Sequence, residues 1–290
     1  FKPGWTSYQY RLQYQTYDIA NYLHSGENEI SFLCAPGWAS GYLGKGNINH
    51  TYTDHISLSA VLNITYADGS VLDIVTDPSW DVMTDKVISS EFYHGETQDL
   101  GREPKLIGKA RADRAPDTRL IPDEGGNVTE HERLKPVAFM ITPKGERVID
   151  FGQNLAGYVE VRIKGKKGDR VTISHAEVLD KDGNFYMKNL ELAKCTDTYV
   201  LSGNDDILKP NFSFHGYRYI RLDEYPFDNV DMDAFTSVAI YTDMERTGAF
   251  SCGNDKINRL YQNSVWGQRS NFIDVPTDCP QRDERCGWTG

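Results

Sequence analysis

The strongest pattern in the chain is Ile56-Ser-Leu-Ser-Ala-Val-Leu-Asn-Ile-Thr-Tyr66, which continues through Ala67-Asp-Gly-Ser70 into Val71-Leu-Asp-Ile-Val75. Apolar residues occupy every second position of the first run, and a period of two is typical of a strand with one buried face. Asp68-Gly69 is a favoured two-residue turn between antiparallel strands. The segment therefore predicts a β-hairpin.

Similar short runs lie on both sides of this hairpin. Further strands are predicted at 8–18, 28–34, 89–92, 147–151, 157–163, 170–175, 197–201, 212–222 and 235–241. Short strands separated by Gly and Asp turns are typical of antiparallel sandwiches. The predicted fold class is mainly β, with two antiparallel β-sandwich domains, the first of the jelly-roll kind.

The composition changes between residues 101 and 132, where Arg, Asp, Pro and Gly dominate. Such a segment indicates a linker, or a crossover that is poor in strands. We place the domains at 1–112, 113–247 and 248–290.

The residue period changes again after Ser251. Asn254 or Asp255 is suited to cap the N-terminus of a helix. The residues that share one helical face are Ile257, Leu260, Tyr261, Ser264, Val265 and Gln268. We therefore predict one amphipathic helix at the start of the last domain.

Composition limits the kinds of partner. The 290 residues carry a net charge of −11, so binding to nucleic acid or to an anionic membrane surface is not expected. No apolar run is long enough for membrane insertion. The five cysteines lack CxxC spacing, which argues against a zinc site or a disulfide framework. The chain starts with Phe1, so we expect a fragment of a longer polypeptide, and its localisation stays unknown.

The C-terminal segment reads Asp274-Val-Pro-Thr-Asp-Cys-Pro-Gln-Arg-Asp-Glu-Arg-Cys-Gly-Trp-Thr-Gly290. Four successive charged residues stand at 282–285, after two prolines and before Gly287-Trp288. A charged segment that is restrained by proline and closed by an aromatic residue is typical of a binding surface. The alternative is a surface ion-pair network with a core tryptophan.

The chain resembles bacterial α-L-rhamnosidases of glycoside hydrolase family 78 along its whole length. The most specific match runs from Asp278 to Gly290 and follows Val265-Trp-Gly-Gln-Arg269, at the start of the family's (α/α)6 catalytic barrel. Weaker matches lie at 5–18 and 37–38, in the family's jelly roll, and at 150–154, 175–184, 193–199 and 214–218, in its concanavalin-like sandwich. The resemblance implies both sandwiches, followed by the first helix and motif loop of a truncated barrel.

The same resemblance implies roles for individual residues. Glu284 matches the family's general acid, and Asp278, Arg282 and Trp288 match positions that hold the rhamnose ring. We expect Asp283 and Arg285 to have a supporting role next to these residues, without contacting the sugar. The family's general base is a Glu much further along the polypeptide, so this fragment alone is expected to be inactive.

Enzymes of this family invert the configuration at the anomeric carbon. One carboxyl group therefore protonates the leaving oxygen while another activates water. Glu284 must then be protonated at the working pH. Burial beside Trp288 and the nearby carboxylates of Asp278 and Asp283 are expected to raise its pKa. Arg282 and Arg285 oppose that rise. Asp278 can accept bonds from sugar hydroxyls, Arg282 can donate them, and Trp288 offers an apolar face.

Two histidines, each with a charged residue close by in the sequence, are interpreted as structural. His175 with Glu177 and His215 with Arg218 lie two and three residues apart on predicted strands, without metal-ligand spacing. Sugar contacts at the junction of sandwich and barrel are the alternative. No metal site and no cofactor are predicted from these residues.

Two further segments carry polar residues that a ligand could use. Asp180, Asp182 and Asn184 alternate as calcium ligands do, but the segment is too short for an EF-hand and a hairpin turn is favoured. In the first domain, Trp38, Trp80 and Glu96–Asp99 are candidates for a carbohydrate-binding face. Calcium is possible in that domain and is not adopted here.

We therefore expect part of a glycoside hydrolase that removes terminal non-reducing α-L-rhamnose from rhamnose-containing oligosaccharides, polysaccharides or plant glycosides. One alternative is a non-catalytic carbohydrate-binding protein built from the two sandwiches. Another is an (α/α)6 glycosidase that acts on a different sugar. The sequence does not predict the oligomeric state.

Overall fold

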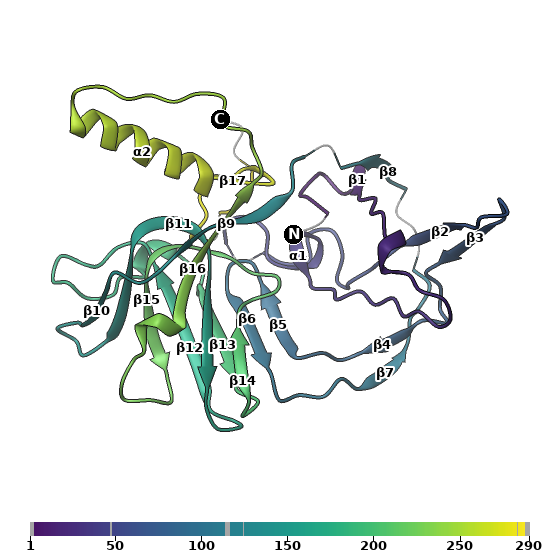
Figure 1. The fold of residues 1–290 in the computed structure, drawn as a ribbon, viewed down its shortest axis with the longest axis horizontal. Coiled ribbons are helices and arrows are strands. Elements are labelled where there is room, and N and C mark those ends of the chain that lie inside the picture. The colour runs from purple at the N-terminus through teal and green to yellow at the C-terminus, as the bar shows by residue number, and fades with distance from the viewer. Residues whose placement is uncertain (1–2, 47, 114–116, 124, 283, 288–290) are drawn as a thin grey trace.

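The computed structural model describes residues 3–46, 48–113, 117–123, 125–282 and 284–287, and its architecture is mainly β, as predicted (Figure 1). Ten strands form one sheet: β5 (Val87–Glu91), β6 (Gly95–Asp99), β9 (Val128–Leu134), β10 (Ala138–Ile141), β11 (Arg147–Lys164), β12 (Arg170–Ala176), β13 (Thr196–Val200), β14 (Asp205–Leu208), β15 (His215–Glu224) and β16 (Phe235–Thr242).

The remaining strands form two-stranded sheets: β1 (Arg11–Tyr14) with β8 (Arg119–Pro122), β2 (Val61–Thr65) with β3 (Val71–Val75), β4 (Asp81–Met83) with β7 (Leu106–Lys109), and β17 (Phe272–Ile273) with β18 (Val275–Pro276). The helices are α1 (Gly37–Ser40) and α2 (Asp255–Ser270), with short 3-10 turns at η1 (Ala20–Tyr22), η2 (Lys188–Leu190) and η3 (Met232–Ala234). Neither α1 nor α2, within the described ranges, combines the length and apolar character that crossing a bilayer requires.

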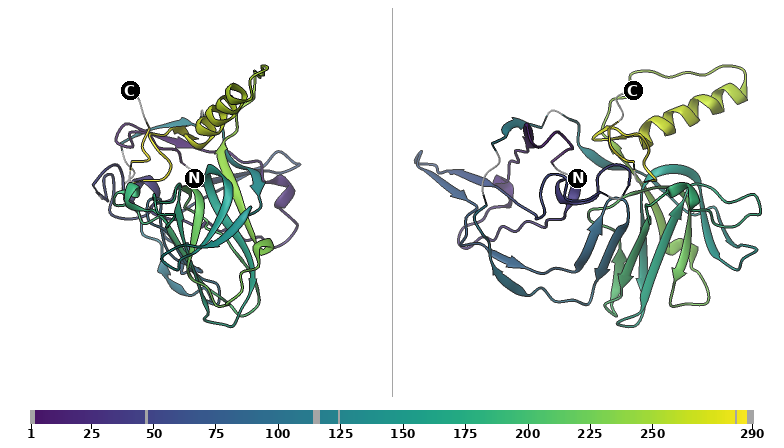
Figure 2. Two further views of the ribbon diagram at one scale, coloured as in Figure 1. Left: turned by 90° about the vertical axis from the view of Figure 1, so that its left-hand side faces the viewer. Right: turned by 180° about the vertical axis from the view of Figure 1, so that it is seen from behind.

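The large sheet is organised around β11. Its strands follow the order β5-β6-β13-β12-β15-β11-β16-β9, with β10 and β14 also paired to β11, and the sheet curls on itself (Figure 2). From Leu155 to Val161 every residue of β11 is buried, which indicates that both faces of this strand are covered. The main apolar core of the described structure therefore lies within the curl.

The sequence predicted two strands, at 147–151 and 157–163, where β11 is one continuous strand. The register of β11 against β15 shifts between Asp150 and Leu155, so the junction of the two predicted strands is a β-bulge. Gly152 adopts φ 76°, a conformation that a side chain would strain. Its N–H donates to the Asp150 carboxylate at 2.6 Å, which closes the bulge locally.

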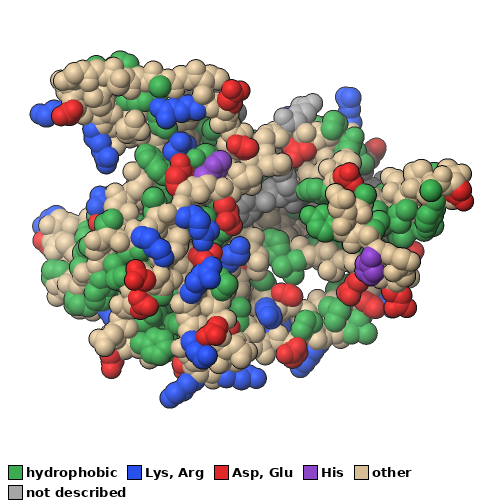
Figure 3. All heavy atoms as spheres, viewed as in Figure 1, with side chains coloured by type: hydrophobic (Ala, Val, Ile, Leu, Met, Phe, Trp, Pro, Cys, Tyr) green, Lys and Arg blue, Asp and Glu red, His purple; other side chains and the backbone are tan. Residues whose placement is uncertain are grey.

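The predicted hairpin forms as β2 and β3, with Val61 opposite Val75 and Gly69 at φ 83°. Both strands are largely exposed, and hydrophobic side chains gather on the arm at the right of Figure 3. The strand predicted at 28–34 does not form. Ile30, Phe32 and Leu33 are exposed there, so no packing stabilises an extended pairing.

The segment predicted to be poor in strands, 101–132, contains β7, β8 and the start of β9. In addition, β6 pairs in parallel with β13, with Thr97 opposite Thr198. Strands from the first third of the chain therefore extend the large sheet. The domain limits at 112 and 247 stay predictions.

Helix α2 begins where the sequence predicted it. The Asn254 side chain accepts from the N–H groups of Lys256 and Ile257, as an N-cap does. Ile257 and Leu260, on the predicted apolar face, are exposed. The helix contacts the sheet instead through Trp266, which packs on the core, and through Arg269.

Arg269 explains which face of α2 lies against the sheet. Its guanidinium pairs with Glu132 on β9 at 2.8 Å and lies 5.2 Å from the ring centres of both Trp266 and Tyr241. A periodicity count of apolar residues cannot detect a contact made by a cation on aromatic rings.

Candidate active site

The motif segment forms a closed loop beyond α2. After the short pair of β17 and β18, Thr277 bridges to Gly287 and the Asp278 N–H donates to the Cys286 carbonyl at 3.0 Å. These contacts bring the two ends of the loop together. Glu284 is therefore presented from a loop of defined ends rather than from an open tail.

Three of the predicted site residues meet within this loop. The Arg282 guanidinium contacts Asp278 at 3.0 Å through Nη2 and Glu284 at 2.8 Å through Nη1. Arg282 and Asp278 are 28% and 29% exposed and Glu284 is 38% exposed, so all three remain accessible to a ligand. Two carboxylates bridged by a forked donor form a polar surface that suits vicinal hydroxyl groups.

Asp283 and Trp288, also predicted as site residues, lie outside the described residues. The expected apolar platform at Trp288 therefore stays a prediction.

Arg285 is placed on the opposite side of the loop, inside the protein. It is fully buried, and its Nη1 donates to the backbone carbonyls of Phe92 and of Phe214, the latter at 2.7 Å. The guanidinium also lies 4.9 Å from the Phe214 ring centre and 5.6 Å from that of Tyr93. Arg285 thus attaches the loop to the large sheet.

Sequence reasoning assigned no role to Cys195, although it contacts this loop. Its thiol donates to the Gln281 carbonyl at 2.9 Å and lies 3.5 Å from Arg285 Nη2. No local pattern indicated this contact, because Cys195 lies just before β13 and has φ 45°, outside the alternation of the strand. All five cysteines are free, including Cys279 and Cys286.

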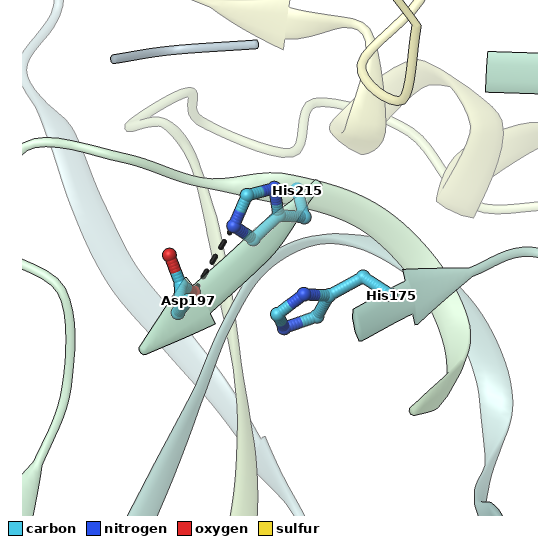
Figure 4. Close-up of side chains that lie close together, drawn as sticks. All are labelled: His175, Asp197 and His215. Atoms are coloured by element: carbon cyan, nitrogen blue, oxygen red, sulfur yellow. Dashed lines mark hydrogen bonds and ion pairs between the residues drawn. The ribbon is translucent and has the colours of Figure 1, made fainter. Parts of the chain in front are cut away.

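Beneath Cys195 lies a buried cluster of His175, Asp197 and His215 (Figure 4). His215 Nε2 lies 3.0 Å from the Asp197 carboxylate, and His175 Nδ1 lies 3.0 Å from the Cys195 carbonyl. Burial lowers the pKa of His175 to about 3. For His215, burial acts in the same direction, but the charge of Asp197 and its hydrogen bond raise the pKa to about 9.

The geometry of this cluster does not suit a metal ion. The two imidazole rings stack with centres 4.1 Å apart and planes inclined by 26°. Because the nitrogen lone pairs lie in the ring planes, two stacked rings cannot both point at one ion about 2.1 Å away. The cluster is better described as an imidazolium–carboxylate pair covered by a neutral histidine, in agreement with a structural role.

A cavity of about 520 Å³ lies next to Asp278, between α2 and the sheet. The residues that line it include Gln153, Asn154, Glu177, Arg218, Trp266 and Gln281. Burial raises the pKa of Glu177, while a hydrogen bond from Asn154 opposes the rise. Arg218 is held in place by two bonds to Asp150, at 2.8 and 2.7 Å.

The other candidate ligand segments have structural explanations. Asp180 Oδ1 accepts from the N–H groups of Asp182 and Asn184, which is the predicted hairpin turn. Glu96 is 1% exposed and accepts from the backbone of Asn211 and Phe212. Its carboxylate therefore cannot join Trp38 and Trp80 in a surface for carbohydrate.

Three family models match consecutive parts of the chain. The α-L-rhamnosidase N-terminal domain matches residues 1–130. The bacterial α-L-rhamnosidase concanavalin-like domain matches residues 141–241. The bacterial α-L-rhamnosidase six-hairpin glycosidase domain matches residues 245–290.

Two curated relatives are α-L-rhamnosidases. The protein from Streptomyces avermitilis is 37% identical over 301 residues, which cover 99% of this chain and 29% of the relative. A protein from Formosa agariphila is 35% identical over 301 residues, which cover 99% of this chain and 32% of the relative. The chain thus spans about a third of the length of these relatives.

Solved structures agree in fold. Native α-L-rhamnosidase from Aspergillus terreus matches with a TM-score of 0.90 at 38% identity, covering 99% of this chain and 35% of that one. The Streptomyces avermitilis enzyme in complex with L-rhamnose matches with a TM-score of 0.91 at 34% identity, covering 99% and 29%. Together with the consecutive family matches, these similarities show that the chain belongs to the bacterial α-L-rhamnosidase family.

Proposed function

We propose that this chain is part of an inverting α-L-rhamnosidase in which Glu284 is the general acid. The substrate is a terminal non-reducing α-L-rhamnose of an oligosaccharide, polysaccharide or plant glycoside. The observation that carries the proposal is the loop geometry: Glu284 and Asp278 are bridged by Arg282, and all three are accessible. Membership of the family supports the choice of sugar.

In the proposed reaction, Glu284 donates a proton to the glycosidic oxygen as the bond to the anomeric carbon breaks. Asp278 accepts hydrogen bonds from ring hydroxyls. Arg282 can donate to the sugar while it stays paired with Asp278, which leaves Glu284 available to the leaving group. Arg282 contacts both Asp278, which would bind the sugar, and Glu284, the proposed acid. This one side chain would therefore fix the distance between the sugar and the acid.

The partner carboxylate of the proposed mechanism comes from outside this chain. In inverting glycosidases the two carboxyl groups stand roughly 6.5–9.5 Å apart, with the attacking water between the base and the sugar. Glu284 would face that base across the sugar ring. Acid and base then come from distant parts of one polypeptide.

The test uses the full-length gene product and a panel of p-nitrophenyl glycosides. We expect hydrolysis of the α-L-rhamnoside in preference to the other sugars, and β-L-rhamnose as the first product seen by proton NMR. Glu284→Gln should reduce turnover of an alkyl α-L-rhamnoside by about 10²–10⁴-fold, the usual contribution of general acid catalysis. Binding without turnover would favour the non-catalytic alternative, and preference for another sugar would overturn the substrate assignment.

A further inference from the structure

The backbone around Glu284 is attached to the large sheet on both sides. Three residues before it, the Gln281 carbonyl accepts from the Cys195 thiol at 2.9 Å. One residue after it, Arg285 is fully buried against the carbonyls of Phe92 and Phe214. Only three residues, one of them Glu284, therefore lie between the two attached residues.

The attachment at Arg285 consists of hydrogen bonds and ring contacts rather than an ion pair. The partners of this guanidinium are two carbonyls, the Cys195 sulfur and two aromatic faces. Among the described residues no carboxylate forms an ion pair with it, although its charge acts to lower the pKa of the partly buried Glu91 carboxyl against the larger effect of burial. A buried cation is costly unless such partners are held in place. This side chain fits one position, and a different loop conformation would leave the charge unpaired.

The attachment at Cys195 is equally constrained. Cys195 has φ 45°, which is uncommon for a residue with a side chain. Its N–H donates to the Tyr93 carbonyl at 3.1 Å, and its carbonyl accepts from the N–H and Nδ1 of His175. The backbone contacts fix the direction of the thiol toward Gln281.

Close packing completes the contact. A Cβ at Gly216 would lie 2.9 Å from the Gln281 Cβ and 3.0 Å from the Pro280 ring, so the loop lies directly on β15. Gly216 follows His215, whose ion pair with Asp197 stands beneath the thiol. The loop is thus packed on the most buried polar part of the sheet.

We propose that Arg285 and Cys195 are positioning residues for the acid, which fix the carboxyl group of Glu284 relative to the sugar by attaching its backbone to the concanavalin-like sheet. This inference rests on the proposed function, since it concerns how the acid is placed. It assigns the sheet a part in catalysis although no side chain of the sheet need touch the reacting atoms.

The test compares two rhamnosides in the full-length protein. A p-nitrophenyl group leaves readily and needs little protonation, whereas an alkyl alcohol needs a well-placed acid. Displacing a reacting group by about 1 Å costs on the order of 10²-fold in rate. For Arg285→Met we expect kcat to fall by about 10²-fold on the alkyl rhamnoside and by less than about tenfold on the p-nitrophenyl rhamnoside, with KM changed little.

Conservative variants and a matched control separate positioning from folding. Arg285→Lys should recover part of the loss, because an ammonium group can still donate to one carbonyl. Cys195→Ala should show the same selective loss in milder form, and Cys195→Ser should recover it, because a hydroxyl can donate to Gln281. Arg269→Met, which removes a comparable arginine from α2, should leave the ratio between the two substrates unchanged.

Equal falls on both substrates, in Arg285→Met or in Cys195→Ala, would overturn the inference. If Arg285→Met does not fold, the comparison of Cys195→Ala with Cys195→Ser tests the inference without it. Glu284→Gln, measured in parallel, keeps the two proposals distinct. If kcat on the alkyl rhamnoside falls selectively in Glu284→Gln but not in the Arg285 and Cys195 variants, only the inference is overturned. If Glu284→Gln itself shows no selective fall on the alkyl rhamnoside, the proposed function is overturned and the inference with it.

Discussion

Replacing Asp197 by asparagine should destabilise the chain in a pH-dependent way. Asp197 is 2% exposed and lies 3.0 Å from His215 Nε2. Although burial acts to lower the pKa of His215, this carboxylate raises it to about 9. Asparagine keeps the shape and can still accept from the Glu96 N–H and the Ser213 hydroxyl, but it carries no charge.

The magnitude follows from the pKa of His215. The ordinary value is 6.5, and a rise to about 9 corresponds to about 3 kcal/mol at about 1.4 kcal/mol for each unit. The stabilisation is complete below pH 6.5, where the unfolded chain also holds the proton. It is lost as the pH rises through 9, because the folded chain then releases the proton too.

Urea unfolding of the 290-residue chain, followed by tryptophan fluorescence between pH 6 and 9.5, measures this difference. We expect Asp197→Asn to lower the free energy of unfolding by about 3 kcal/mol at pH 6 and by progressively less toward pH 9.5. The control is Asp205→Asn, since Asp205 forms an exposed pair with Lys164 at 3.3 Å. That variant should change stability by less than about 0.5 kcal/mol at every pH. An equal cost of Asp197→Asn at pH 6 and pH 9.5 would refute the reasoning.

Four further outcomes can be checked by the same unfolding measurements. Burial holds the pKa of His175 at about 3, so stability should fall as the pH drops from 6.5 toward 3, and His175→Phe should flatten that decline. Gly157→Ala should cost about 1–3 kcal/mol, because its Cβ would lie 1.9 Å from the Val238 carbonyl oxygen; a neutral result would contradict the tight strand contact. Gly267→Ala meets no atom within 4 Å and should leave stability unchanged or raise it by up to about 1 kcal/mol. Asn254→Ala should cost about 1 kcal/mol through loss of the helix cap, and no change would mean that the cap is not formed in solution.

The elements predicted best from sequence are those specified by local patterns. The β2–β3 hairpin depends on alternation and on an Asp-Gly turn, and the start of α2 depends on the Asn254 cap. Both signals lie within a few residues of the structure that they specify. The strands around β11 were recognised for the same reason.

The elements missed are those that depend on distant contacts. The parallel pairing of β6 with β13 joins residues about a hundred positions apart, and nothing local in either strand indicates it. The bulge in β11 was not recognised as part of one strand, because Gly152 interrupts the strand pattern in the sequence. The contact of α2 with the sheet was not predicted, because it involves a charged residue, Arg269, that packs on aromatic rings.

The candidate site was identified largely through its motif. Local chemistry alone left the charged loop open to interpretation as a surface ion-pair network. The structure adds what no pattern could predict: the loop's buried side at Arg285, and the thiol of Cys195 that holds Gln281. Both contacts cross from the motif loop to the sheet, over separations of 71 or more residues.

The most direct test of the account compares leaving groups in Glu284→Gln. The full-length variant and the parent protein are assayed for kcat on an alkyl α-L-rhamnoside and on a 2,4-dinitrophenyl α-L-rhamnoside, whose leaving group departs without protonation. If Glu284 is the general acid, kcat should fall by about 10²–10⁴-fold on the alkyl substrate and by less than about tenfold on the dinitrophenyl substrate. Losses of similar size on both substrates, or near-parental turnover of the alkyl rhamnoside, would contradict the assignment of Glu284.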